Sequence, residues 1–462
     1  MQHLHTIVAV ATGEGGAIAV VRVSGPEAIP LCDTLFTGVN GRKLHTQQGY
    51  TLLYGTIGSA EGGVVDDVLV SVFRAPHSYT GEDMIEISCH GSAYVKQEIV
   101  RLLVDAGAKP AQPGEFTLRA FLNGKLDLAQ AEAVADLIAS DSRGAHNLAI
   151  HQMRGGYSDE FRKLRQQLID LAALLELELD FGEEDVEFAD RSRIGELMDQ
   201  LSARIGALKD SYAWGNVIKN GVPVAIIGSP NVGKSTLLNA LLKEDKAMVS
   251  DIPGTTRDVI EDVMNIGGVQ FRFIDTAGIR RTDDALEMMG IERTFKRMAH
   301  ASVILFVVEA SQSVPEIESQ LKSIDWQPRQ HTVVVLNKTD KAGNETESLR
   351  QALEQATGFR VFPVSAKSGA NLDALTDYLY GLAGRAPDRP DMIVTNARHY
   401  EALAEAGVAI GRAKQALEQG YSGDLLAEDV RSVILAVGAV TGDAPTSDDV
   451  LQAIFSRFCI GK

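Results

Sequence analysis

The sequence predicts a multidomain protein in which an α/β domain interrupts a helical one. Residues 1–120 mix short strands with a helix in an α+β pattern, residues 121–217 and 383–462 carry amphipathic helices, and residues 218–382 alternate strands with helices. Because the two helical segments have the same character, we expect them to form one discontinuous helical-bundle domain around the α/β insertion. A chain of 462 residues is long enough for several such cores.

The N-terminal segment contains three apolar runs that predict strands, at residues 18–23, 68–73 and 84–89. Residues 94–106 repeat apolar side chains at the spacing of a helix. The glycine-rich run 13–16 lacks the third glycine of a dinucleotide-binding fingerprint, so we interpret it as a turn. His90 has no partner at a metal-ligand spacing and is interpreted as structural.

Two stretches of the helical segment repeat apolar residues at spacings of three and four: Phe161, Leu164, Leu168, Leu171 and Leu175, then Ile194, Leu197, Leu201, Ile205 and Leu208. Such stripes indicate the core of a helix bundle. The acidic run 182–187 is expected to be a solvated connection. After a linker at 385–390, helices are expected at 396–420 and 425–440, and a last one after the cap residues 446–449.

The α/β domain contains a strand, a glycine-rich loop and a helix start in direct succession. Strand 222–227 is followed by Gly228-Ser229-Pro230-Asn231-Val232-Gly233-Lys234-Ser235-Thr236, which matches the phosphate-binding pattern G-x-x-x-x-G-K-[ST]. The glycines let backbone N–H groups face phosphate oxygens, and the helix N-terminus adds partial positive charge. We expect Lys234 to reach the β- and γ-phosphates and the Ser235 hydroxyl to bind Mg²⁺.

Two later motifs select the base. Asn337-Lys338-Thr339-Asp340 follows an apolar strand at 332–336 and resembles the base-reading motif of GTPases. The Asp340 carboxylate would accept hydrogen bonds from N1–H and the 2-amino group of guanine, a donor pair that adenine lacks. Lys338 would lie along the base and the ribose. Ser365-Ala366-Lys367, after a strand at 359–364, resembles the loop whose backbone N–H donates to guanine O6.

Two further motifs resemble the switches of a GTPase. Asp275-Thr276-Ala277-Gly278 follows a strand at 269–274 and resembles the second switch; Gly254-Thr255-Thr256-Arg257-Asp258 resembles the first, with Thr256 as a second hydroxyl ligand of Mg²⁺. With all five motifs in order, residues 218–382 are expected to form a Ras-like P-loop GTPase domain that binds GTP. The expected nucleotide contacts are Asn231, Val232, Gly233, Lys234, Ser235, Thr236, Ser250, Asp251, Ile252, Pro253, Gly254, Thr255, Thr256, Asp275, Thr276, Ala277, Gly278, Asn337, Lys338, Thr339, Asp340, Ser365, Ala366 and Lys367.

Hydrolysis needs a group other than the usual glutamine. Many small GTPases place a glutamine after the second-switch motif to orient the attacking water, but this chain has Ile279 there. Asn231 together with the first switch resembles the potassium-activated GTPases, in which K⁺ does the electrostatic work of an arginine finger. The expected K⁺ ligands are Asn231, Ser250, Ile252 and Thr255.

The residue type of Glu287 alone indicates an ordinary exposed helix glutamate, and only a resemblance to a known family makes it the candidate for orienting the water. Lys234 and Thr256 complete the expected catalytic set. Three arginines remain as rival finger residues, namely Arg257, Arg280 and Arg281. If K⁺ completes the site, Na⁺ in its place should slow hydrolysis.

Composition limits the classes of partner and compartment. The formal net charge of −18 argues against strong, unaided binding of nucleic acid. Cys32, Cys89 and Cys459 form no C-x-x-C pair, which disfavours a disulfide framework or a zinc knuckle. No stretch is apolar enough to cross a membrane, and residues 1–5 lack the layout of a secretory signal. We therefore expect a cytoplasmic protein.

Over its whole length the chain resembles the MnmE (TrmE) family, the bacterial GTPases that modify the wobble uridine of tRNA. The resemblance rests on the GTPase motifs, on Pro113-Gly114-Glu115-Phe116, on RAFLNGKLDLAQAEA at 119–133, and on the tail Phe458-Cys459-Ile460-Gly461-Lys462. It implies that residues 1–120 form a tetrahydrofolate-binding domain that also dimerises the chain. It implies folate contacts at Arg22, Glu86, Lys125 and Lys462.

The resemblance also implies a reaction and a partner. A 5-formyl- or 5,10-methylene-tetrahydrofolate would supply a one-carbon unit. Together with MnmG (GidA), an FAD-dependent partner that joins it in a heterotetramer, the family adds a carboxymethylaminomethyl or aminomethyl group at C5 of wobble uridine 34 of certain tRNAs. Cys459 is a candidate nucleophile on spacing alone, and a thiol near a substrate need not react.

The expected mechanism is a conformational switch. GTP and K⁺ order the first switch, the two G domains of a dimer approach each other, and hydrolysis releases them. Two rival functions stay open at this point: a ribosome-assembly GTPase, which would be expected to carry a basic RNA-binding face, and a regulatory GTPase scaffold with no part in one-carbon chemistry.

Overall fold

The computed structural model describes residues 5–59, 63–181, 191–246, 262–267, 269–274, 301–322, 324, 331–342, 345–382, 392–421, 423–456 and 458–461. It divides into two compact units, one of residues 1–139, 149–205 and 401–462 and the other of residues 140–148 and 206–400. This grouping differs from the three domains expected from the sequence, whose limits at 120, 217 and 382 stay a prediction. Among the described helices, none combines the length and apolar character needed to cross a bilayer.

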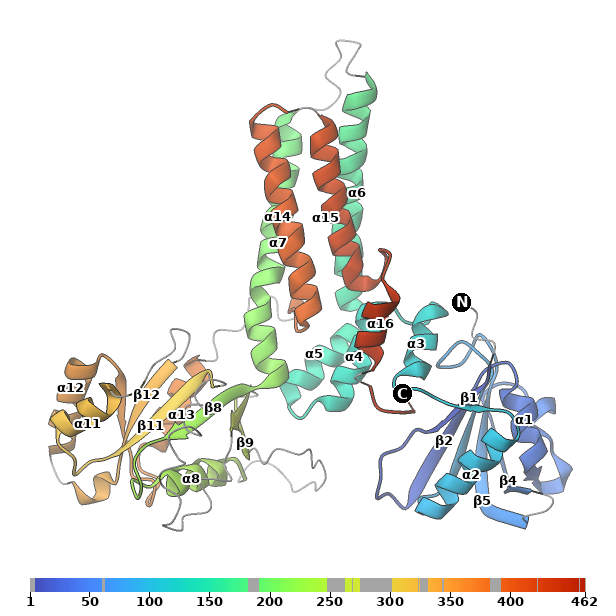
Figure 1. Ribbon diagram of the computed structural model, residues 1–462, viewed down its shortest axis with the longest axis horizontal. Helices are drawn as coiled ribbons and strands as arrows, with labels where there is room; N and C mark the ends of the chain where they lie inside the picture. Colours follow the sequence, from blue (N-terminus) through green and yellow to red (C-terminus); the bar gives the residue numbers. More distant parts are fainter. Residues whose placement is uncertain are drawn as a thin grey trace. The chain divides into compact units, whose positions relative to one another are not determined.

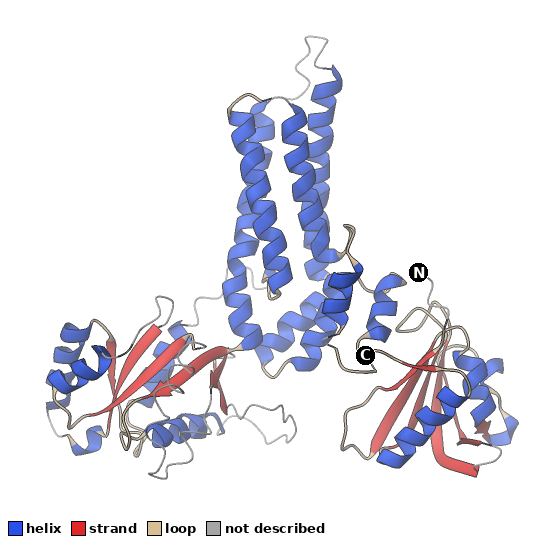
Figure 2. Ribbon diagram, viewed as in Figure 1, coloured by secondary structure: helices blue, strands red, loops and turns tan. Residues whose placement is uncertain are grey.

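The first unit contains a seven-stranded sheet with the order β3-β4-β5-β6-β2-β1-β7 (Figures 1 and 2). Its strands are β1 (Ile7–Val10), β2 (Ile18–Ser24), β3 (Phe36–Gly38), β4 (Thr51–Ser59), β5 (Gly63–Phe73), β6 (Met84–His90) and β7 (Lys109–Pro110). Only β1 and β7 pair in parallel. The three expected strands are confirmed as β2, β5 and β6, and the run 13–16 contains the turn between β1 and β2.

Two helices, α1 (Ala28–Leu35) and α2 (Ala93–Asp105), pack on the same core as one face of this sheet. Val21 and Val70 of the sheet are buried in a cluster with Ile29 of α1 and Leu103 of α2. The helix expected at 94–106 is therefore confirmed as α2. Because side chains alternate along a strand, the residues between the buried ones face the other side.

The remaining helices begin after the sheet, and their bounds are α3 (Glu115–Leu122), α4 (Leu128–Ala139), α5 (Arg143–Met153), α6 (Gly156–Phe181), α7 (Arg191–Asn220), α14 (Ala397–Glu418), α15 (Gly423–Thr441) and α16 (Asp448–Phe455). The helices expected at the C-terminal end are confirmed as α14, α15 and α16. The Ser447 hydroxyl caps α16 by accepting from the N–H of Val450.

Ion pairs join neighbouring helices of the first unit, although α6 and α15 are far apart in the sequence. Arg431 of α15 contacts Glu176 of α6 at 2.7 Å, and Arg412 of α14 contacts Asp429 of α15 at 2.8 Å. Two more pairs link α7 to its neighbours, Arg204 with Glu160 of α6 and Asp199 with Lys414 of α14. Exposed pairs of this kind contribute little stability, so apolar burial holds these helices together.

The buried stripe of α7 corrects one detail of the sequence prediction. Ile194, Leu201, Ile205 and Leu208 are buried as expected, but Met198 is fully buried where Leu197 was expected. Leu197 is only half-buried. Met198 lies four residues after Ile194 and three before Leu201, so it shares their face of the helix. The expected stripe of α6, from Phe161 to Leu175, is buried throughout.

The second unit contains a six-stranded sheet with the order β13-β12-β11-β8-β10-β9. Its strands are β8 (Val222–Ile227), β9 (Asp262–Ile266), β10 (Val269–Phe273), β11 (Val303–Glu309), β12 (His331–Asn337) and β13 (Arg360–Pro363). Only β9 is antiparallel to its neighbour. The four strands expected in this domain are thus confirmed as β8, β10, β12 and β13, and with them the mixed α/β and α+β fold class.

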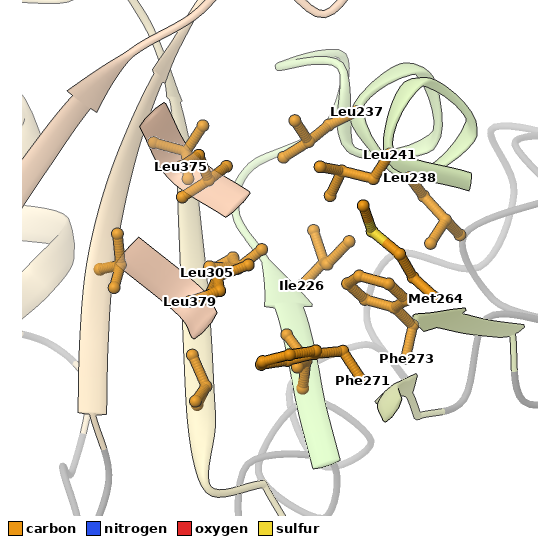
Figure 3. Packing of buried hydrophobic residues seen from close by; sticks show 14 of the residues in the cluster. Ile226, Leu237, Leu238, Leu241, Met264, Phe271, Phe273, Leu305, Leu375 and Leu379 are labelled. Carbon is orange, nitrogen blue, oxygen red and sulfur yellow. The ribbon is translucent and has the colours of Figure 1, made fainter. Parts of the chain in front are cut away.

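Helices cover both faces of this sheet. Helices α8 (Lys234–Lys246) and α13 (Leu372–Leu382) share one buried cluster with the strands, and α11 (Val314–Lys322) and α12 (Thr346–Thr357) share the other. In the first cluster, Leu237 and Leu241 of α8 approach Ile226 of the central strand (Figure 3). Burial on both faces explains the nearly continuous apolar sequences of β8, β11 and β12.

The α7 register can be tested with neighbouring residues. Met198→Ala should lower the free energy of unfolding by about 2–4 kcal/mol, because it removes a fully buried side chain and leaves a cavity. Leu197→Ala is the matched control and should cost clearly less. Urea denaturation followed by circular dichroism measures both. Equal destabilisation by the two changes would contradict the register described here.

Candidate functional site

The candidate nucleotide site lies at the carboxyl ends of the parallel strands in the second unit. Strand β8 is central, and it pairs in parallel with β10 on one side and β11 on the other. The loop after β8 therefore follows a strand that has a parallel neighbour on each side. The carboxyl end of such a strand is the usual position of a ligand crevice in an open α/β sheet. The base-reading motifs follow β12 and β13 at the same edge.

The glycines of the phosphate loop are required by close contacts. Gly228 has φ +148°, and a Cβ atom there would lie 2.2 Å from the carbonyl oxygen of Val307 in β11. Gly233 has φ +97°, and its Cβ would lie 2.4 Å from Nδ2 of Asn337. The ammonium of Lys234 donates to the loop carbonyls of Gly228 at 2.8 Å and Ser229 at 2.7 Å. The loop thus keeps the lysine within the curve that phosphate oxygens would enter.

Asn337 connects the phosphate loop with the last of the base-reading loops. Its side chain is 2 % exposed. Nδ2 donates to the carbonyl oxygen of Val232 at 2.9 Å, and Oδ1 accepts from the N–H of Ala366 at 3.0 Å. One buried amide therefore satisfies backbone groups of two loops that are 134 residues apart in sequence, from Val232 to Ala366.

The Asp340 carboxylate is exposed and is held by its neighbour. Oδ1 accepts from the Ser365 hydroxyl at 2.7 Å, and this hydrogen bond lowers the pKa of Asp340 below its ordinary value. Ser365 is itself buried. The carboxylate is therefore charged at neutral pH and still accessible, which is what recognition of a donor pair on a base requires.

Lys338 adopts the left-handed conformation, with φ +63°. Its ammonium contacts Oε2 of Glu309 at the end of β11, at 2.7 Å. The hydrogen bond from Lys338 holds the pKa of Glu309 below its ordinary value. Analysis of the sequence missed Glu309, and the available signal was only its position at the end of an apolar strand.

The structure brings together the described part of the expected site, which consists of the phosphate loop, residues 337–340 and residues 365–367. Asn231 lies in this loop, exposed and with φ +60°. Part of the expected site lies outside the described residues: Ser250, Asp251, Ile252, Pro253, Gly254, Thr255, Thr256, Asp275, Thr276, Ala277, Gly278 and Glu287. The rival residues Arg257, Arg280 and Arg281 also lie outside them.

A second polar site lies on the sheet of the first unit. Arg22 of β2 and Glu86 of β6 are direct cross-strand partners. Nε and Nη2 of Arg22 donate to Oε1 of Glu86 at 2.9 and 2.7 Å. Two rings flank the guanidinium, with centroids 5.2 Å (Tyr79) and 5.6 Å (Phe116) from its Cζ. Neither aromatic residue was predicted from the sequence as part of this site, although Phe116 belongs to the motif Pro113-Gly114-Glu115-Phe116.

The C-terminal tail reaches the same arginine. Nη1 of Arg22 donates to the carbonyl oxygen of Gly461 at 3.3 Å. Gly461 precedes Lys462, which lies outside the described residues. Lys125 donates to the carbonyl oxygen of Pro76 at 3.1 Å, in the loop that also carries Tyr79. Of the four expected folate contacts, only Arg22 and Glu86 are described here as contacting each other.

The cysteines differ in exposure. Cys32 and Cys89 are buried, and burial raises the pKa of both thiols, that of Cys89 to about 11. Cys459 is exposed. Nδ1 of His90 lies within hydrogen-bonding distance of Oδ1 of Asp66, at 2.7 Å. In the part of the chain that the structure describes, no group of three or more His, Cys, Asp or Glu side chains is arranged to hold a metal ion.

Two family models match the chain. The model described as the GTP-binding protein TrmE N-terminus matches residues 6–125, and the model described as the MnmE helical domain matches residues 128–459. The second match spans the six-stranded sheet as well as the helices on either side of it in sequence.

Relatives named tRNA modification GTPase MnmE match over nearly their whole length. The protein from Bacteroides fragilis is 51% identical over 467 residues, covering 99% of each chain. The protein from Bacteroides thetaiotaomicron is 51% identical over 465 residues, again covering 99% of each. That from Cytophaga hutchinsonii is 47% identical and covers 100% of this chain and 98% of its own.

Solved structures of G-domain proteins are also similar in part. The G domain of the T. maritima FeoB iron transporter is 23% identical, covers 35% of this chain and 99% of its own, and has a TM-score of 0.26. A GTP-binding protein from Sulfolobus solfataricus in complex with GDP is 20% identical, covers 52% and 71%, and has a TM-score of 0.27.

The Asn337 connection leads to a prediction. Asn337→Asp should destabilise the second unit by about 3 kcal/mol, because it buries a charge and turns a carboxylate oxygen toward the carbonyl of Val232. Affinity for a guanine nucleotide should fall with it. Asn239→Asp makes the same change at an exposed position of α8 and should leave both quantities unchanged. Thermal unfolding and nucleotide titration measure them, and identical behaviour of the two variants would refute the connection.

Proposed function

This chain belongs to the MnmE (TrmE) family, and we propose that it is a GTP hydrolase that acts in tRNA modification. The nucleotide part of the proposal is carried by the buried Asn337 amide, which joins the phosphate loop to Ala366 beside an exposed Asp340 carboxylate. The tRNA part is carried by the identity of about half of the residues to relatives named tRNA modification GTPase MnmE. The three-domain division at residues 120, 217 and 382 is part of the proposal.

Guanine selection follows from hydrogen-bond satisfaction. The charged Asp340 carboxylate would accept from N1–H and the 2-amino group, and the N–H of Lys367 would donate to O6, because that of Ala366 already donates to Asn337. Adenine offers neither pattern and would leave these groups unpaired. Because the Ser365 hydroxyl already occupies one position on Asp340 Oδ1, the carboxylate approaches the base in a fixed orientation.

Phosphate binding would use the curved loop after β8. Lys234 would exchange the carbonyls of Gly228 and Ser229 for the β- and γ-phosphate oxygens. The N-terminus of α8 behind the loop adds partial positive charge. We propose that the hydroxyls of Ser235 and Thr256 bind Mg²⁺, which neutralises charge on the transferred phosphoryl group when bound. Ser235 is half-buried at the start of α8, which suits this role.

We propose that hydrolysis depends on K⁺, since Ile279 cannot orient a water molecule. The left-handed conformation of Asn231 leaves its side chain exposed in the phosphate loop, which suits a ligand of a cation beside the phosphates. Ser250, Ile252 and Thr255 would supply the other oxygen ligands, and Glu287 would orient the water. A bound K⁺ supplies the positive charge that an arginine finger supplies elsewhere.

The first unit would supply the folate site. We propose that the Arg22–Glu86 pair, flanked by Tyr79 and Phe116, binds a 5-formyl- or 5,10-methylene-tetrahydrofolate. The fit is chemical: a carboxylate matches the donor edge of a pterin, and Lys125 and Lys462 match the carboxylates of the glutamyl part. The folate would supply the one-carbon unit that ends on C5 of wobble uridine.

The same face of the sheet supports a homodimer. Leu52 and Tyr54 of β4 and Leu69 of β5 are 58, 55 and 42 % exposed. Tyr54 and Leu69 are cross-strand partners, so the three side chains form one apolar area on the face opposite α1 and α2. Apolar areas of this kind mark interaction sites on soluble proteins. We propose that a second copy covers it, and that an FAD-dependent partner, MnmG, joins the dimer in the cytoplasm.

Salt and concentration test the nucleotide part of the proposal. In K⁺ the chain should hydrolyse GTP at least about tenfold faster than in Na⁺ at equal ionic strength, because the cation stabilises charge in the transition state. The rate per subunit should rise with enzyme concentration if paired G domains hydrolyse GTP. Asn231→Ala should abolish the difference between the salts. Equal rates in both salts, or equal turnover of ATP, would refute this part.

Nucleoside analysis tests the tRNA and folate parts. tRNA from a strain that lacks the gene should carry unmodified wobble uridine, and the intact gene should restore the modification. Glu86→Gln should fail to restore it, because the change removes the charge that holds Arg22. Glu27→Gln makes the same change at an exposed residue before α1 and should restore it fully. Unchanged wobble uridine in the deletion strain would exclude the tRNA role.

A further inference from the structure

Lys338 would contact the base and ribose, yet its backbone conformation is unusual for lysine. A residue with a Cβ atom is uncommon at φ +63°, ψ 36°, so neighbouring groups must hold it there. The carbonyl of Lys338 accepts from the N–H of Lys341 at 3.0 Å, and the N–H of Thr339 donates to Val364 at 3.3 Å. These bonds fix the backbone but leave the long side chain to be ordered by something else.

The carboxylate of Glu309 orders that side chain. The two charged atoms are 2.7 Å apart, and the two side chains are only 25 % and 28 % exposed. Partial shielding from water makes such a charge-assisted hydrogen bond stronger than one at the open surface. A lysine has about four rotatable bonds, so fixing it before the ligand arrives reduces the entropy lost on binding.

Glu309 is itself held in place by the sheet and by a turn. It ends β11 and lies opposite Asn337 in the parallel register with β12. Its N–H donates to Oε1 of Gln312 at 3.0 Å, and its carbonyl accepts from the N–H of Gln312 at 3.0 Å. The N–H of Ala310 donates to the carbonyl of Asn337 at 2.9 Å. The carboxylate therefore projects from a rigid position beside the base-reading motif.

We propose that Glu309 is a positioning residue for the guanine site, acting through Lys338 to set nucleotide affinity. The inference rests on the proposed function. It predicts an effect on nucleotide affinity and none on the rate of the chemical step. Because Lys338 contacts the base and ribose, loss of Glu309 weakens GDP and GTP binding by the same factor and leaves kcat at saturating GTP unchanged.

A double-mutant cycle tests the proposal on the full chain. Glu309→Gln keeps the size of the side chain but removes its charge, and should raise the Kd for GDP by about five- to tenfold. Lys338→Met should raise it further. In the Lys338→Met background, the added Glu309→Gln change should have no effect, because the ammonium that it positions is gone. Glu309→Asp, which keeps the charge on a shorter side chain, should give an intermediate Kd.

Glu318→Gln is the matched control. Glu318 forms an ion pair with the exposed Lys322 within α11, one turn along the same helix, and its loss should leave the Kd unchanged. A change of less than twofold for Glu309→Gln would overturn the proposal, and so would an equal change in the presence and absence of Lys338. A fall in kcat at saturating GTP would also overturn it. The proposed function is tested separately by comparing the Kd of the unaltered chain for GDP with its Kd for ADP. Failure of the proposed function can therefore be distinguished from failure of the positioning role of Glu309.

Discussion

The parallel pairing of β8 with both of its neighbours is the constraint on which the candidate nucleotide site depends. Strand β8 lies between β10 and β11, so the loop that follows it cannot pair with either strand and must turn over the edge of the sheet. The carbonyl of Val307 in β11 lies directly beside that turn and excludes every side chain at Gly228. The sheet thus determines both where the phosphate loop begins and which residue can begin it.

A parallel sheet collects loops at one edge but does not join them to each other. Strands β12 and β13 end at Asn337 and Pro363, and a side chain connects the phosphate loop to the loop that follows β13. The Asn337 amide does this because it has a donor and an acceptor in one rigid group, and each reaches a different backbone. An aspartate would satisfy only the N–H of Ala366, because a carboxylate cannot donate to the carbonyl of Val232. The close approach of this amide also explains why Gly233 has no side chain.

Local sequence predicted the parts of this structure that local forces determine. Strands buried on both faces, such as Val222–Ile227, are apolar throughout, and the helix after the phosphate loop begins where the motif requires. The α7 stripe was wrong at one position because Leu197 and Met198 both lie three or four residues from Ile194 on one side and from Leu201 on the other. Only packing against the other helices shows that Met198 is the buried one.

Contacts between distant residues could not be predicted in this way. Glu309 and Lys338 are 29 residues apart, and their contact depends on the register of β11 against β12. Neither residue type is unusual by itself, so no pattern marks the pair. Arg22 and Glu86 could be named only through the family resemblance. From their sequence alone they are two charges on separate strands, and their contact depends on a register set 64 residues apart.

The C-terminal tail is also positioned by contacts between residues that are distant in sequence, in the first unit. Gly461 is buried with φ +94°, and a Cβ atom there would lie 2.2 Å from the carbonyl of Val10 at the end of β1. Its own carbonyl accepts from Arg22, which is also bound by Glu86. A larger residue would therefore separate the tail from the sheet and remove one of the acceptors of this arginine. The glycine in the C-terminal motif is thus explained by a steric limit, because only a residue without a side chain fits beside the carbonyl of Val10.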